Sequence, residues 1–231
     1  MGILHMEHLR KLLSNPLSEV KTKNPIKIED AFYNIAKHLF NEYCIKNDTK
    51  IFRFAEVEFY YYKRGEWDED WTKVTYPRNK NAGELFFHYS GVDICFQCHI
   101  DENDSSNVEF GGILIRSLVE VDDNGRLLKL HAGPQYCANL ILNTSREQFP
   151  KLTKATEFGC DLRRTTRFGI EKSEREREEK DGFNLCFYIN HFESDLLNWN
   201  ETSKRIDWNI KENKYKESKR NYARDRFYNL K

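Results

Sequence analysis

Two carboxylates stand among aromatic residues in the stretch 51–62, and their spacing could support chemistry. Glu56 and Glu58 are two positions apart, and Tyr60 follows at the same interval. Side chains of a strand alternate between its faces, so these three would share one face. That face would carry Phe52, Phe54, Glu56, Glu58, Tyr60 and Tyr62. A carboxylate beside aromatic rings suits a site that holds a planar ligand and acts on it. The commoner alternative is ordinary ion pairing with Lys or Arg across a half-exposed sheet.

The stretch 51–62 itself predicts a strand, because it is rich in aromatic and β-branched residues and contains no Gly or Pro. Strict alternation assigns five residues to the opposite face: Ile51, Arg53, Ala55, Val57 and Phe59. This second face is apolar except for Arg53. We therefore expect it to face the core, with Arg53 paired or reaching toward solvent at its end.

The remaining segments predict the elements that would position this strand. Apolar residues recur every three to four positions from Glu29 to Tyr43, which indicates an amphipathic helix. Turn residues separate further strands over 84–89, 92–100, 111–118 and 183–192 and a helix over 135–142. We expect an α+β fold: a single domain with a curved, mostly antiparallel sheet flanked by helices.

Charge is balanced over the whole chain but not along it. The 231 residues contain 37 basic and 37 acidic side chains, so no overall field favours nucleic acid. From residue 203 onward, however, ten basic residues accompany four acidic ones. We expect an N-terminal extension over 1–24, a domain over 25–200 and a basic, helical tail over 201–231. In the tail, four residues are predicted to contact phosphates: Lys214, Lys216, Lys219 and Arg220.

Several classes of protein are excluded by what the sequence lacks. It has no run of about 18 apolar residues, so we expect no membrane segment. The first residues lack the apolar centre of a secretory signal. The six cysteines are therefore expected to be free thiols in a reducing compartment.

The motif Cys95-Phe-Gln-Cys98-His99 has the spacing of a covalent haem site and could also suggest zinc. In an alternating strand, however, Cys95 and Cys98 point to opposite faces, because they are an odd number of positions apart. The sequence also lacks a glycine-rich phosphate loop, a nucleophile elbow and a His-Glu-x-x-His motif. We expect no metal and no cofactor.

The block Ala55-Glu-Val-Glu-Phe-Tyr60 is similar to the Val-Glu-x-Glu-Ala-Tyr strand of the alkyladenine (3-methyladenine) DNA glycosylase family. Further blocks, in order between about residues 28 and 192, resemble the same family. The other blocks are Thr75-Tyr-Pro-Arg-Asn-Lys80, Gly83-Glu-Leu-Phe-Phe-His-Tyr-Ser-Gly91, Gly112-Ile-Leu-Ile-Arg-Ser-Leu118, Gly133-Pro134, Arg167-Phe-Gly-Ile170 and Leu185-Cys-Phe-Tyr188. The resemblance implies that family's fold and the removal of an altered purine from DNA.

The resemblance also implies roles for individual residues. Glu58 would be the carboxylate that activates water, with Tyr60 and His88 as the rings that hold the base. Arg116 would lie near the reacting nucleotide, and Gln97 would probe the edge of the base. Four further residues would contact DNA or wall the pocket. Tyr89, or Ser90 if one residue is deleted, would be the wedge in the duplex, Arg78 and Asn79 would bind DNA, and Trp67 or Trp71 would replace a pocket His that this chain lacks.

This chemistry agrees with the residue types. Aromatic faces compensate the stacking that a flipped base loses, and a carboxylate stabilises the positive charge that develops on the sugar. We therefore expect a monomeric, monofunctional DNA glycosylase of base excision repair that binds double-stranded DNA, cytoplasmic and nucleoid-associated in a bacterium or nuclear in a eukaryote. Two alternatives remain: a lesion- or nucleic-acid-binding module without catalysis, and a hydrolase of another modified base or nucleoside.

Overall fold

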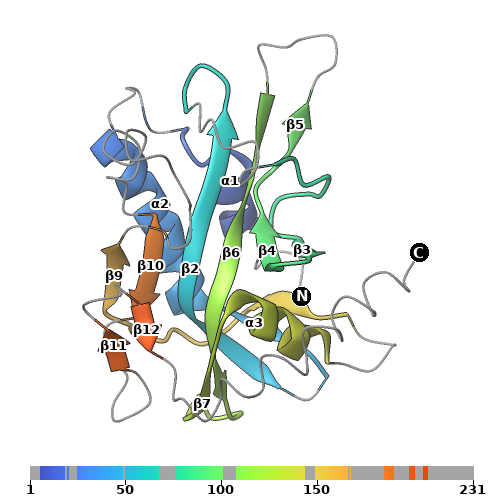
Figure 1. The fold of residues 1–231 in the computed structure, drawn as a ribbon, viewed down its shortest axis with the longest axis vertical. Helices are drawn as coiled ribbons and strands as arrows, with labels where there is room; N and C mark the ends of the chain where they lie inside the picture. Colours follow the sequence, from blue (N-terminus) through green and yellow to red (C-terminus); the bar gives the residue numbers. More distant parts are fainter. Residues whose placement is uncertain are drawn as a thin grey trace.

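The computed structural model describes residues 6–18, 20, 25–48, 50–67, 76–100, 108–143, 149–165, 167, 185–189, 198–200 and 205–207. Over these residues the protein is an α+β domain built on a curled antiparallel sheet (Figure 1). The helices of this part are α1 (Glu7–Ser14), α2 (Pro25–Glu42) and α3 (Pro134–Leu142). None of them is long and apolar enough to span a membrane.

The strands of the described part form one ten-stranded sheet and a separate pair. The large sheet contains β1 (Tyr43–Lys46), β2 (Ile51–Lys63), β3 (Leu85–His88), β4 (Gly91–Cys95), β5 (His99–Ile100), β6 (Val108–Val121), β7 (Leu127–Ala132), β8 (Lys151–Lys154), β9 (Leu162–Thr165) and β10 (Cys186–Ile189). The pair is β11 (Asn198–Asn200) and β12 (Arg205–Asp207).

The two long strands β2 and β6 pair along their whole length and form the spine of the sheet (Figure 1). Its main order is β3-β4-β6-β2-β1-β8. β10 pairs with the middle of β2 and then with β9, while β5 and β7 pair with opposite ends of β6. The sheet therefore brings β10, β2, β6, β4 and β3 side by side.

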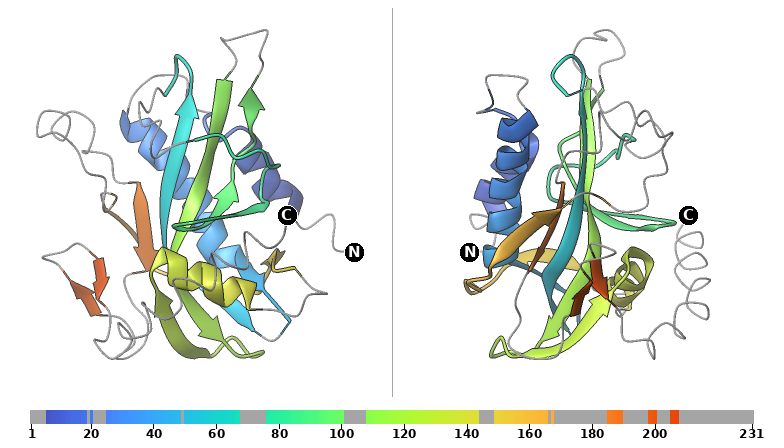
Figure 2. Two further views of the ribbon diagram at one scale, coloured as in Figure 1. Left: turned by 45° about the vertical axis from the view of Figure 1, so that its right-hand side comes forward. Right: turned by 60° about the vertical axis from the view of Figure 1, so that its left-hand side comes forward.

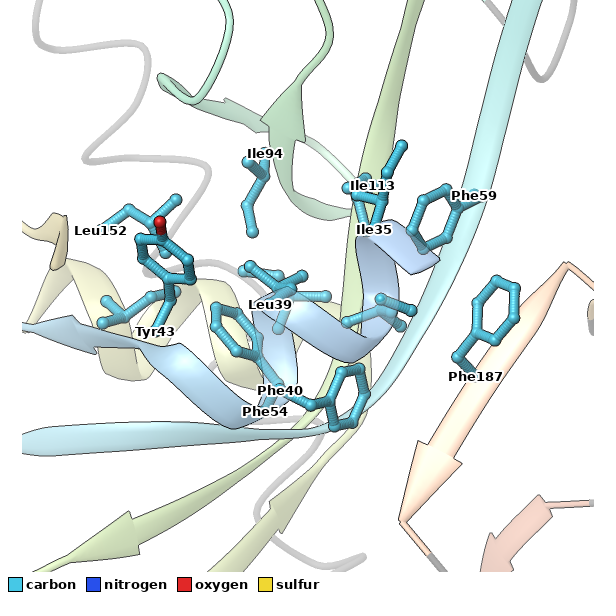
Figure 3. Packing of buried hydrophobic residues seen from close by; sticks show 14 of the residues in the cluster. Ile35, Leu39, Phe40, Tyr43, Phe54, Phe59, Ile94, Ile113, Leu152 and Phe187 are labelled. Carbon is cyan, nitrogen blue, oxygen red and sulfur yellow. The ribbon is translucent and has the colours of Figure 1, made fainter. Parts of the chain in front are cut away.

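Helices α1 and α2 cover one face of the sheet, and α3 lies on the other (Figure 2). The core fills the space between α2 and the sheet (Figure 3). The ring of Phe32 lies 5.2 Å from that of Phe59, and Phe40 lies 6.1 Å from Phe54. Each such side chain contributes roughly 1.5–3 kcal/mol when fully buried. The stripe of apolar residues on α2 therefore fixes which face of β2 is internal.

Helix α1 belongs to this core, although residues 1–24 were expected to be an extension. Leu9 and Leu13 are fully buried in the main hydrophobic cluster. The carbonyl of Leu13 also accepts a hydrogen bond from the backbone N–H of Gln97. The domain thus includes at least α1.

Strict alternation along β2 is wrong at its start. Phe54 and Phe59 are five residues apart, yet both contact α2, and Phe52 is also in the core cluster. The register with β6 shifts on either side of Glu56, so Ala55 and Arg116 have no directly opposed residue. Such a bulge re-aims the side chains that follow it. Phe52 and Phe54 therefore do not share the face of the glutamates.

The expected fold class is confirmed as an α+β domain with a curved antiparallel sheet. The predicted helices over 29–43 and 135–142 correspond to α2 and α3, and the predicted strands over 51–62, 84–89, 111–118 and 183–192 correspond to β2, β3, β6 and β10. The predicted strand over 92–100 is instead divided into β4, which ends at Cys95, and β5. Arg53 is buried and donates hydrogen bonds to the carbonyls of Tyr43 and Thr156. Of the tail 201–231, only Arg205–Asp207 is described, and it is a strand.

Candidate active site

One row of directly opposed residues crosses the sheet from β10 to β4. Cys186 faces Glu58, Glu58 faces Leu114, and Leu114 faces Asp93. Opposed residues of antiparallel strands point to the same face. Because Val57 and Phe59 lie in the core beneath α2, the row points to the other face, on which α3 packs. Two buried carboxylates, Glu58 and Asp93, therefore share this face two strands apart, about 10 Å between their Cα atoms.

Glu58 is fully buried, and both of its carboxylate oxygens have partners. The hydroxyl of Tyr60 donates to Oε2 at 2.8 Å, and Arg116 Nη1 lies 3.2 Å from Oε1. Burial, followed by the charge of Glu58, raises the pKa of Tyr60 well above its ordinary value. Tyr60 therefore stays protonated and acts as a hydrogen-bond donor to the carboxylate.

Glu56 shares the same guanidinium. Arg116 Nε donates to Glu56 Oε1 at 3.1 Å, and the Ser117 hydroxyl donates to Oε2 at 3.0 Å. Burial raises the pKa of Glu56, only partly offset by the charge of Arg116. Burial alone would lower the pKa of Arg116, but Glu58 and Glu56 raise it, so the guanidinium stays charged. One cation thus serves two carboxylates, and we call Glu56, Glu58, Tyr60 and Arg116 the glutamate cluster.

A metal ion does not suit the glutamate cluster. The possible ligand atoms of Glu56, Glu58 and Cys186 lie within 4.8 Å of one another. The guanidinium of Arg116, however, already provides the positive charge between the two carboxylates. Burial also raises the pKa of Cys186 well above its ordinary value, whereas a metal binds the thiolate. The donor set therefore favours an ion-paired site.

The face of the Tyr60 ring is covered by a second guanidinium. Arg167 lies with its central carbon 4.8 Å from the ring centroid. Its Nη1 donates to the carbonyl of Phe59 at 3.0 Å. A cation over an aromatic face contributes about 0.5–2 kcal/mol. The ring predicted to stack on a base therefore holds a planar cation of the protein itself.

A second buried carboxylate, Asp93, forms a cluster at the β3–β4 hairpin. Arg78 Nε donates to Asp93 Oδ2 at 2.6 Å, and His88 Nε2 lies 3.3 Å from the same oxygen. Burial alone would raise the pKa of Asp93, but contact with His88 and the charge of Arg78 lower it. A methyl group at Gly112 would lie 2.6 Å from Arg78 Nε, so glycine permits this approach. We call Arg78, His88 and Asp93 the aspartate cluster.

Comparison of the chain with family models, with curated proteins and with solved structures found no match in any of the three. The function must therefore be argued from the geometry of the two clusters. Both lie on the face of the sheet that α2 leaves uncovered, and each contains buried charges that the apolar core could not accommodate.

The structure brings three of the predicted residues together, namely Glu58, Tyr60 and Arg116. His88 is predicted to oppose Tyr60 across a base, but its contacts are with the aspartate cluster. Its ring stacks on that of Phe86, with 6.0 Å between centroids. The role of His88 as the second base-stacking ring is therefore not supported by these contacts.

The predicted DNA contacts differ in exposure. Arg78 is buried against Asp93, and its guanidinium lies over the ring of Tyr76. A group held in this way is not presented to a phosphate, so the predicted DNA-binding role of Arg78 is not supported. Asn79 is exposed, and Tyr89 at the hairpin turn is 61 % exposed. These two positions remain accessible to a partner.

The other predicted pocket residues lie away from the glutamate cluster or outside the described residues. Gln97 Oε1 accepts a hydrogen bond from the backbone N–H of Ala82. Trp67 pairs with Lys63 at the end of β2 and packs against the core. Those outside the described residues are Trp71, Lys214, Lys216, Lys219 and Arg220.

Several residues in or beside the two clusters were not predicted from the sequence. Asp93 had a usable signal, since an acidic residue stands between Val92 and Ile94 in an otherwise apolar strand. Ser117 and Cys186 contact Glu56 only because β6 and β10 flank β2. Their roles depend on strand register, which the sequence does not display locally.

Proposed function

We propose that the protein is a monofunctional N-glycosylase that hydrolyses the bond between an altered purine and its sugar in double-stranded DNA. One observation carries the proposal: the Tyr60 hydroxyl donates to the Glu58 carboxylate, both on the face opposite α2. This places a carboxylate beside an aromatic ring. The resemblance of the surrounding blocks to alkyladenine DNA glycosylases supports the same assignment.

The chemistry divides between the ring and the carboxylate. A flipped base stacks on Tyr60, which replaces about 1–3 kcal/mol of lost stacking. As the bond from the sugar carbon to the base nitrogen breaks, positive charge develops on the sugar and Glu58 stabilises it. Water then adds to the sugar carbon, with its proton accepted by Glu58, and the base leaves with the bonding electron pair.

The cations near this carboxylate favour simple hydrolysis. Lyase chemistry begins with an amine that forms a Schiff base with the sugar. In the part of the chain that the structure describes, the guanidinium groups of Arg116 and Arg167 lie against Glu58 and Tyr60. A guanidinium does not deprotonate in proteins, so it cannot serve as that amine. Arg116 instead pairs with the Glu58 carboxylate, with 3.2 Å between Nη1 and Oε1.

Glu58 is fully buried, so the site must open before a base can bind. A base that stacks on Tyr60 has to displace the Arg167 guanidinium from the ring. That displacement removes one cation–π interaction and one hydrogen bond to the Phe59 carbonyl. A cationic, alkylated base would restore the cation–π interaction, whereas a neutral base would restore only stacking.

The direct test is to incubate the protein with alkylated duplex DNA and to separate the released bases by chromatography. We expect release of an altered purine and an abasic site without strand cleavage. Intact DNA after prolonged incubation with alkylated and with deaminated duplexes would contradict the proposal. The free nucleosides, tested in parallel, address the alternative of an N-glycoside hydrolase for small substrates.

The basic tail supports a polymeric substrate. Replacing Lys214, Lys216, Lys219 and Arg220 by alanine should weaken DNA binding uniformly across sequences. The slope of log affinity against log salt should become shallower by nearly one unit for each lost phosphate contact. Binding measured over a range of salt checks this, and an unchanged slope would exclude the tail from the interface.

The second candidate function is a lesion-binding module without catalysis. It is favoured by one specific observation, namely that both oxygens of Glu58 are already engaged by Tyr60 and Arg116. Such a carboxylate can be a purely structural ion pair. Tight binding to alkylated DNA with no release of bases would identify this second function.

A further inference from the structure

Two histidines meet where the first two helices pack together, on the face of the sheet opposite the glutamate cluster (Figure 2). His8 lies on α1 and His38 on α2, and their Nε2 atoms are 3.5 Å apart. The rings meet edge-on, with 4.7 Å between their centroids. His8 is exposed, and the His38 side chain is 28 % exposed. The pair therefore places two potential metal ligands side by side at a surface that solvent reaches.

The ring of His38 is oriented by a residue one turn further along α2. His38 Nδ1 lies 2.6 Å from Glu42 Oε1, an i,i+4 pair on one side of the helix. Glu42 Oε2 also lies 3.7 Å from Lys154 Nζ, and a carboxylate in an ion pair only accepts hydrogen bonds. Nδ1–H of His38 is therefore the donor, and the lone pair of the neutral imidazole is on Nε2, which faces His8. Carboxylates orient the histidine ligands of metal sites in the same way.

The separation of the two Nε2 atoms fits one shared metal ion. At 3.5 Å, the direct contact between the imidazoles is at the long limit of a hydrogen bond. A tetrahedral zinc ion with zinc–nitrogen bonds of about 2.0–2.1 Å holds two nitrogen ligands about 3.3–3.4 Å apart. Adjacent ligands of a square-planar copper ion would be only about 2.8 Å apart. Because His8 is exposed, its side chain can turn to aim its nitrogen at the same point as that of His38.

We infer that His8 and His38 bind one zinc ion through their Nε2 atoms, with water at the other two positions. Imidazole nitrogen is a preferred ligand of zinc, whereas magnesium and calcium prefer oxygen. The ion takes the place of any proton on these nitrogens. The two histidines are 30 positions apart in the sequence, so the expectation of no metal, drawn from closely spaced motifs, did not cover them. Glu58 takes no part, so this site is independent of the proposed glycosylase.

The zinc site ties α1 to α2. Helix α1 has only eight residues, and isolated helices shorter than about 12–15 residues are marginal in water. It is held in the domain by the buried side chains of Leu9 and Leu13 and by the hydrogen bond from Gln97 to the Leu13 carbonyl. An ion that binds only when α1 is docked on α2 stabilises the docked form. The role of the site is therefore structural.

The test titrates the full chain with zinc chloride and follows the histidine rings in long-range proton–nitrogen NMR spectra. The Nε2 resonances of His8 and His38 should shift together and stop changing at one zinc ion per chain. Calorimetry with the same salt should show that His8→Ala weakens zinc binding by more than the about 10–100-fold that is typical of a change outside the ligand set. The matched control is His99→Ala, because His99 is also exposed, and it should bind zinc as the wild type does.

Glu42→Gln should weaken zinc binding by about 10-fold, because a neutral amide orients the His38 ring less strongly than a carboxylate. Zinc should also raise the midpoint of thermal unfolding of the wild type and of His99→Ala, but not that of His8→Ala.

Three results would overturn the inference. One is a zinc affinity of His8→Ala equal to that of the wild type, which would place the ion elsewhere. Another is an equal rise in the unfolding midpoint of wild type and His8→Ala on addition of zinc. The third is that excess zinc leaves the ring resonances of His8 and His38 unchanged, in which case the two imidazoles form a hydrogen-bonded pair only.

Discussion

The glutamate cluster and the aspartate cluster hold buried carboxylates with different numbers of basic side chains. Each holds buried carboxylates on the face of the sheet away from α2. In the first, two carboxylates share the single guanidinium of Arg116. In the second, one carboxylate, Asp93, lies against both Arg78 and His88. Accordingly, the pKa of Glu56 is raised by burial, whereas the pKa of Asp93 is lowered despite burial.

This difference between the clusters suits them to different chemical roles. A site with an excess of carboxylate is suited to accept protons and to face positive charge that develops in a substrate. A carboxylate held by a guanidinium and an imidazole has a lowered pKa and can orient its neighbours. The glutamate cluster is therefore the better candidate for cleavage of a glycosidic bond. The aspartate cluster is the better candidate for positioning an imidazole.

Removing Arg116 should produce the largest change in stability. Arg116→Met leaves Glu56 and Glu58 buried together without a cation, and we expect a loss of about 5 kcal/mol in the free energy of unfolding. Denaturant unfolding measures it. As a control, Arg163→Met removes an exposed pair with Asp161 and should cost less than about 1 kcal/mol. Equal losses in the two variants would mean that the glutamate cluster is not a buried ion pair.

Asp93→Asn should cost on the order of 3 kcal/mol at neutral pH, because Arg78 is left buried without its anion. The folded pKa of Asp93 is lowered from its ordinary 3.8. Its contribution is therefore present above pH 3.8 and is lost as the pH falls through the folded pKa. The difference between wild type and Asp93→Asn should narrow in acid, and unfolding measured at several pH values checks this. A stability difference between wild type and Asp93→Asn that widens at low pH would contradict the lowered pKa of Asp93.

Gly112→Ala should cost about 1–3 kcal/mol, because the new methyl group meets Arg78 Nε at 2.6 Å and must displace it. The matched test is the double variant with Arg78→Ala. If the cost arises from this contact, Gly112→Ala should be much milder when Arg78 is absent. Additive costs would show that Gly112 is needed for another reason.

Glu56→Gln should have the smallest effect, below about 1 kcal/mol. The amide oxygen can still accept a hydrogen bond from the Ser117 hydroxyl, and Arg116 stays paired with Glu58. Burial raises the pKa of Glu56, so the amide removes a charge that burial already penalises. Base release should also be nearly unchanged. If Glu56→Gln released bases as slowly as a variant altered at Glu58, the two glutamates would act as a unit.

The regular elements could be predicted from the sequence because they depend on local periodicity. The apolar spacing of 32, 35, 36, 39 and 40 indicated α2, and the aromatic run indicated β2. The face of Phe54 could not be predicted, since the bulge beside it depends on the pairing of β2 with β6. Alternation of side chains between the two faces is reliable only where the paired strands contain no bulge.

The candidate site could be predicted in part. The resemblance indicated Glu58, Tyr60 and Arg116, which the structure brings into contact. It also assigned His88 to the base and Arg78 to DNA, but both contact Asp93. These partners meet across β4 and the loop after residue 75, and such long-range contacts leave no local pattern in a single sequence.

The central claim is that Glu58 is the carboxylate that cleaves the glycosidic bond, and Glu58→Gln tests it most directly. The amide keeps the shape of the side chain but cannot accept a proton from water. Measured on alkylated duplex DNA, release of bases should fall by about 10²–10⁴-fold while DNA affinity stays within about twofold of wild type. Unfolding measurements on the same sample establish that the variant is folded. Release of bases at the wild-type rate by folded Glu58→Gln would contradict the account.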